Sequence, residues 1–108
     1  MKKIKISLEY GCFPVWIYDE ENRLIDNDLP IELIGDADID PSFVHIQKCY
    51  DSLFVNDNSE FKYLGFETAV QRELFLEELS FTINKLRKKL SSEYVVEANI
   101  SKIREFLD

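Results

Sequence analysis

The only histidine of the chain, His45, lies four residues before Cys49, one of two cysteines. On a helix this spacing makes two side chains neighbours, and a cysteine nucleophile needs a base such as histidine. Cys49, however, falls on the apolar side of the helix predicted for this region, where a thiol stays protonated and inert. We therefore predict no catalytic residue, and we expect Cys12 and Cys49 to be reduced, buried thiols of a cytoplasmic protein.

Asp36, Asp38 and Asp40 recur at every second position, as at the start of an EF-hand calcium loop. Such a loop requires Gly at its sixth position and Glu at its twelfth, where this chain has Pro41 and Gln47. Zinc sites need clustered Cys and His, and glycine-rich phosphate loops are absent from the sequence. The pattern therefore predicts a helix-entry loop with neither metal nor cofactor, although weak binding of a cation by the three aspartates stays open.

Three short segments near the N-terminus have the residue pattern of β-strands. Residues 3–9 alternate strictly between polar and apolar side chains, which predicts a strand with one wet face. Residues 14–19 are apolar at consecutive positions, which predicts a more central strand. Residues 23–26 follow a polar turn, so the three segments together predict an antiparallel meander.

A first helix is predicted after a loop at residues 27–40. Asp40 is placed to cap this helix, and Pro41 suits its first turn. The helix is expected to run to about residue 55, where a polar segment ends it. Its predicted apolar side consists of Phe43, Ile46, Cys49, Tyr50, Leu53 and Phe54.

A longer helix, residues 69–90, follows a capping-box pattern that begins at Thr68. Its apolar stripe, at spacings of three and four, is Leu76, Leu79, Ile83, Leu86 and Leu90. Strands are also predicted at residues 61–66 and 94–97. A final short helix is predicted at residues 101–107, with Ile103, Phe106 and Leu107 turned inward. Residues 1–108 are thus expected to form a single α+β domain in which a small, mainly antiparallel sheet packs against two main helices.

The overall charge excludes several classes of ligand. The chain has 108 residues, a net charge of −8 and 45% hydrophobic residues. Binding of nucleic acid or of an anionic membrane requires a basic surface, so neither is expected. Charged Lys5 and Glu9 interrupt the N-terminal apolar residues, and we therefore expect no signal peptide and a cytoplasmic location.

Negative charge is concentrated in residues 16–60. This segment contains twelve acidic and two basic residues, so it carries ten net negative charges. The rest of the chain carries two net positive charges. Such asymmetry indicates a basic partner, and tyrosine is a frequent interface anchor. The candidate partner-binding residues are Trp16, Tyr18, Asp19, Glu20, Asp26, Asp28, Glu32, Asp36, Asp38 and Asp40.

A resemblance is carried by two runs in the N-terminal half, YGCFPVWIYD at residues 10–19 and LIDNDLP at residues 24–30. These runs resemble small bacterial immunity proteins encoded beside polymorphic toxins, of the contact-dependent growth inhibition or a related secreted-toxin type. The later run YDSLF, at residues 50–54, is compatible with the same group. The resemblance implies a cytosolic, non-enzymatic protein that binds the C-terminal domain of a cognate toxin and blocks its active site. Many such toxins are basic nucleases, and an acidic inhibitor would mimic their polyanionic substrate and associate fast.

Two other hypotheses stay open at the level of sequence. The chain could be a small acidic regulatory or structural module that self-associates through the stripe of residues 69–90. It could instead be an enzyme that uses carboxylates with a divalent metal ion. The toxin-binding hypothesis predicts a monomer in the free state and a large neighbouring reading frame with a variable C-terminal domain.

Overall fold

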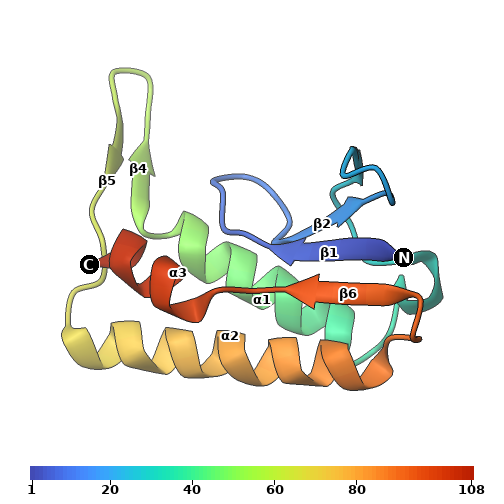
Figure 1. Ribbon diagram of the computed structural model, residues 1–108. Coiled ribbons are helices and arrows are strands. Elements are labelled where there is room, and N and C mark those ends of the chain that lie inside the picture. The colour runs from blue at the N-terminus through green and yellow to red at the C-terminus, as the bar shows by residue number, and fades with distance from the viewer.

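Four strands form the main sheet in the computed structural model, which describes all 108 residues (Figure 1). They are β1 (Lys2–Ile6), β2 (Val15–Tyr18), β3 (Leu24–Asp26) and β6 (Tyr94–Glu97), in the spatial order β3-β2-β1-β6. β1 pairs antiparallel with β2 and parallel with β6, and β2 pairs antiparallel with β3. The predicted meander and the predicted edge strand near residue 95 are therefore confirmed.

Two long helices cover one face of this sheet. α1 (Ile39–Asp51) and α2 (Ala69–Lys89) run side by side in opposite directions in Figure 1. A third helix, α3 (Ile100–Leu107), continues from the end of β6, and a short 3-10 turn, η1 (Ile31–Leu33), lies in the loop before α1. The α+β class with two main helices is thus confirmed, and α3 matches the final short helix predicted at residues 101–107.

Strand alternation decides which side chains enter the core. Ile4 and Ile6 of β1 are buried beneath the helices, and Lys3 and Lys5 point to the open face of the sheet. The core is a single cluster of 17 buried residues. The contribution of α2 to that cluster is Phe75, Leu76, Leu79, Ile83 and Leu86. Because the predicted stripe is buried inside the molecule, self-association through those leucines would require the core to open.

The first helix ends earlier than predicted. α1 stops at Asp51, and Phe54, which was placed on its apolar side, instead begins β4 (Phe54–Asn56). β4 pairs with β5 (Phe61–Tyr63) in a separate two-stranded hairpin that projects from the body of the molecule (Figure 1). The prediction was wrong because an aromatic residue at helical spacing fits a strand equally well, and pairing with β5 decides between them.

Two predictions at helix ends also need correction. The cap position of α1 is Asp38 rather than Asp40, because the Asp36 carboxylate accepts the N–H groups of Asp38 and Ile39 and starts the helix there. Phe106 was expected to point inward, but it is 61% exposed. Leu107, which was also predicted to point inward, is buried.

Leu79, which is fully buried in the middle of α2, tests the core directly. Leu79→Ala should lower the free energy of unfolding by about 2–5 kcal/mol, because apolar contacts are lost and a cavity remains. Leu74→Ala is the matched control on the same helix, since Leu74 is 59% exposed. Urea unfolding measures both variants, and a Leu79→Ala loss no larger than the control would contradict this core.

Candidate functional site

The acidic residues at the β2–β3 turn are held by the chain itself. Asp19 accepts a hydrogen bond from Arg23 Nε at 2.9 Å, and Glu20 lies 2.9 Å from the N-terminal ammonium. Hydrogen bonding to the backbone N–H of Arg23 lowers the pKa of Asp19, and the N-terminal ammonium lowers the pKa of Glu20. Both carboxylates are therefore ionised and partly neutralised by local cations.

The three aspartates before α1 have different partners. Asp36 lies 3.1 Å from Lys89 Nζ, and Asp38 lies 2.7 Å from Lys85 Nζ. Asp40 accepts the N–H of Gly35 at 3.1 Å. Nowhere in the chain do three or more metal-ligating side chains gather in a geometry for a metal ion. The alternating pattern thus serves the start of α1 and its contact with the C-terminal end of α2.

The other candidate residues lie on the sheet and its edge. Trp16 and Tyr18 stand on the open face opposite Lys5 and Lys3, and Trp16 donates its Nε1–H to the carbonyl of Ser7. Asp26, Asp28 and Glu32 follow from β3 to η1, and none of them forms an ion pair within the chain. The ten candidates are therefore spread over the open sheet face, the β3 edge and the start of α1, rather than gathered in one pocket.

His45 and Cys49 do approach each other, as their spacing predicts. Cys49 Sγ lies 3.5 Å from His45 Nε2, and Glu78 of α2 lies 2.6 Å from His45 Nδ1. Cys49 is only partly buried, as is Cys12, so the expectation of two fully buried thiols was wrong. Burial raises the pKa of Cys49, and Glu78 raises it further, so the arrangement keeps a thiol rather than a nucleophilic thiolate.

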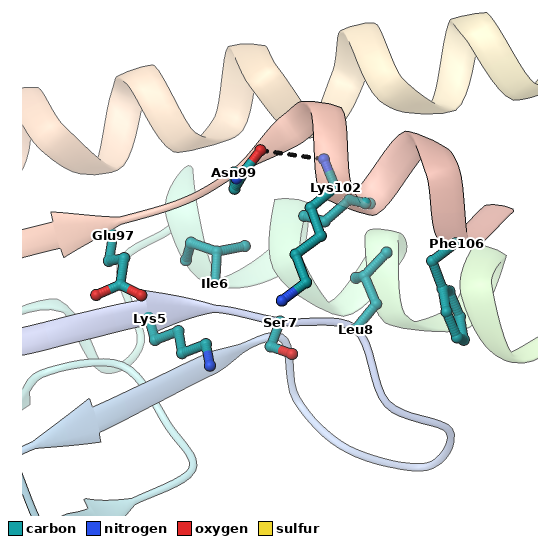
Figure 2. Close-up of a pocket in the computed structure, with 9 residues that line it drawn as sticks. Lys5, Ile6, Ser7, Leu8, Glu97, Asn99, Lys102 and Phe106 are labelled. Carbon is teal, nitrogen blue, oxygen red and sulfur yellow. Dashed lines mark hydrogen bonds between the residues drawn. The ribbon is translucent and has the colours of Figure 1, made fainter.

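A groove of about 360 Å³ lies between the ends of β1 and β6 and the start of α3 (Figure 2). Lys5 and Lys102 extend into it beside Ser7, as Figure 2 shows. Neither lysine forms an ion pair within the chain. Leu8 and Phe106 lie at the other end of the groove in Figure 2, and Phe106 also packs against Tyr63 of the hairpin. The lining also includes Glu97, so the groove carries one net positive charge.

An aromatic cluster at the base of the hairpin was missed by the sequence analysis. It joins six rings from five segments, namely Tyr10, Tyr50, Phe54, Phe61, Tyr63 and Phe106. Burial raises the pKa of Tyr50 to about 12, and Tyr63, Asp51 and Glu9 add to the shift. The available signal was the alternation of Phe61 and Tyr63 after a polar turn, which is typical of a hairpin strand.

A protein-family model described as Serratia CdiI immunity protein-like matches residues 2–99. The chain belongs to this family. The match runs from β1 to the capping residue of α3, so it includes the whole sheet, both long helices and the hairpin. A search of curated proteins found no match.

Membership in the CdiI immunity protein-like family confirms the resemblance drawn from the N-terminal runs. It supports an immunity function in general, with a cognate toxin protein as the partner and a non-enzymatic role. The raised pKa of Cys49 disfavours a thiolate nucleophile at this position. None of the helices is long and apolar enough to cross a membrane.

Asp36 gives a pH-dependent test of the α1–α2 contact. Hydrogen bonds from the N–H groups of Ile39 and Asp38, with Lys89, lower the pKa of Asp36 from 3.8 to about 2. A lowered pKa in the folded state stabilises the fold above the unfolded-state pKa, and this contribution is lost as the pH falls toward about 2. Asp36→Asn should therefore lower the thermal midpoint at neutral pH, and the difference from the unmodified protein should vanish near pH 2. A constant difference over that range would contradict the assignment.

Cys49 gives a second test through its reactivity. Because burial and Glu78 raise its pKa, the native thiol should react with a thiol reagent more slowly than in the unfolded chain. Glu78→Gln should speed the reaction at Cys49 and leave Cys12 unchanged. Mass spectrometry of the labelled peptides across a pH series measures both rates. Native labelling of Cys49 as fast as in denaturant would restore the nucleophile hypothesis.

Proposed function

We propose that this protein neutralises a cognate toxin domain by binding its basic, nucleic-acid-binding surface, as an inhibitor of a nuclease would. The observation that carries the proposal is the family match over residues 2–99, combined with ten net negative charges in residues 16–60. A nuclease must attract a polyanion, and a protein that presents carboxylates to the same surface competes with that substrate.

The ion pairs within the chain show which carboxylates are already neutralised and which are available to bind a basic partner. Five of the twelve acidic residues in this segment pair with a cation of the chain: Asp19, Glu20, Glu21, Asp36 and Asp38. Seven do not, and these are Asp26, Asp28, Glu32, Asp40, Asp51, Asp57 and Glu60. The unpaired charge therefore lies mainly at the β3 edge and at the hairpin. Trp16 and Tyr18, on the open sheet face beside the β3 edge, remain proposed anchors.

Binding alone accounts for neutralisation in this proposal. The protein covers the toxin's active surface, and no bond in the toxin or its substrate is broken by the immunity protein. Steering between opposite charges raises the association rate, which matters because a toxin must be captured before it acts. Residues in the contact then set the dissociation rate.

The proposal predicts a large reading frame next to this gene that encodes the toxin, and the direct test uses the C-terminal domain of that toxin. Cells that express this domain should stop growing, and co-expression of the protein should restore growth. The two purified chains should form a stable complex on size-exclusion chromatography, and nucleic-acid cleavage by the domain should cease in it. A domain that binds the protein yet cleaves no nucleic acid would retain the immunity function and reject the nuclease target.

Asp26 and Asp28 test the electrostatic part of the proposal. Neutralising both, as Asp26→Asn with Asp28→Asn, should slow association several-fold at about 0.01 M salt and have little effect at about 1 M, where the Debye length is about 3 Å. The matched control is Glu67→Gln with Glu77→Gln, which removes the same charge outside the acidic segment. Stopped-flow binding measures both pairs. Equal slowing by the two pairs would mean that only total charge matters.

A further inference from the structure

We propose that the hairpin carries the central contact for the partner, and that this contact receives arginine side chains of a basic protein surface. The proposed contact, here called the aromatic face, consists of Tyr10, Phe54 and Phe61. The inference rests on the proposed function and assigns its contact to a surface absent from the candidate residues predicted by sequence. Its support comes from exposure, ring geometry and charge.

The rings of the aromatic face form one continuous surface. Phe54 and Phe61 stack with centroids 5.3 Å apart and planes 2° from parallel. Tyr10 meets both of them edge-on, at 5.2 Å and 4.9 Å. Phe61 is nevertheless 57% exposed and Tyr10 is 38% exposed. Aromatic side chains packed together yet open to solvent are typical of interface anchors.

The aromatic face is fixed before any partner binds. Phe54 lies opposite Tyr63 in the hairpin, and the Tyr63 hydroxyl donates to the carbonyl of Leu107 at the end of α3. The loop that carries Tyr10 is tied to α1, because the N–H of Gly11 donates to Asp51 at 3.0 Å. A surface held in this way loses little conformational entropy on binding, which favours affinity.

The charges around the face indicate the chemistry of the partner. Asp51 lies under the Tyr10 loop, and Asp57 and Glu60 lie in the turn of the hairpin. With Glu9, these carboxylates have no cation of the chain within 4.0 Å. Lys62 is the only basic residue of the hairpin, and it lies opposite Val55 on the other side of the ribbon. The charged groups in and next to the hairpin that lack a partner in the chain are thus mainly carboxylates.

Arginine fits this combination better than any other side chain. Its planar guanidinium stacks on aromatic rings and binds carboxylates through two parallel hydrogen bonds. A second copy of this chain is disfavoured, because two such faces would bring like charges together. The exposed Phe81 of α2 provides an internal contrast. Lys85 Nζ lies over its ring, 5.1 Å from the centroid, so that ring already has a cation partner within the chain.

Phe61→Ala tests the inference with the same C-terminal toxin domain that tests the proposed function. The variant should weaken binding by about 30-fold or more, chiefly through faster dissociation, as the loss of an interface hot spot does. Phe81→Ala is the matched control, because Phe81 is 64% exposed on α2, and it should change affinity less than about threefold. Surface plasmon resonance measures the rates, and urea unfolding shows whether each variant is folded.

A second variant tests the charges without disturbing the rings. Glu9→Gln with Glu60→Gln should slow association at low salt, and the effect should shrink at high salt. If the unmodified protein binds the domain and Phe61→Ala binds equally well, the inference is overturned and the immunity function stands. If the unmodified protein does not bind the domain, the proposed function fails and this inference with it. A dimer of the free protein that Phe61→Ala converts to a monomer in sedimentation would show that a second copy covers the face, which also overturns the inference.

Discussion

Burial of alternate side chains on β1 is the constraint on which the rest of the fold depends. β1 is the one strand that joins the N-terminal meander to the C-terminal β6, so its pleat decides which face of all four strands the helices cover. Burial of the Ile4 and Ile6 side chains stabilises the fold, whereas the ammonium groups of Lys3 and Lys5 must stay in water. A one-residue slip of β1 would exchange the two sets and bury two ammonium groups. The orientation of β1 therefore places Trp16 on the open face of the sheet and directs the other face toward α1 and α2.

The parts of the fold that sequence could predict are those that local periodicity controls. The alternation of β1 and the three-four spacing of α2 each name a buried face without knowledge of the neighbouring element. The end of α1 could not be predicted in this way, because Phe54 satisfies both a helical and a strand pattern and its choice depends on Phe61 and Tyr63, farther along the chain. For the candidate partner-binding surface, the sequence showed only an excess of negative charge in residues 16–60. The lysines that neutralise Asp36 and Asp38 lie on α2, about half the chain away, and the sequence does not show that contact.

The lysines at the C-terminal end of α2 also determine which acidic residues are neutralised within the chain. Lys85 and Lys89 lie in the last turns of that helix, where cations are favoured by the helix dipole, and they meet the aspartates at the start of α1. The acidic loop before α1 is therefore partly neutralised by the fold itself. No comparable cation lies beside Asp57 or Glu60, so the negative potential of the hairpin is less compensated by the chain.

The hairpin itself shows why an aromatic surface is found at that place. A two-stranded ribbon is marginally stable in water unless something packs against it, and β4–β5 does not join the main sheet. Tyr10 of the β1–β2 loop, Tyr50 of α1 and Phe106 of α3 provide that packing on one side of the ribbon. These contacts leave part of the ribbon open, since Phe61 remains 57% exposed and the hairpin projects from the body (Figure 1). Phe61 thus both packs against Phe54 and Tyr10 and stays accessible, so stabilising the ribbon and the proposed recognition of a basic partner are compatible roles for the same ring.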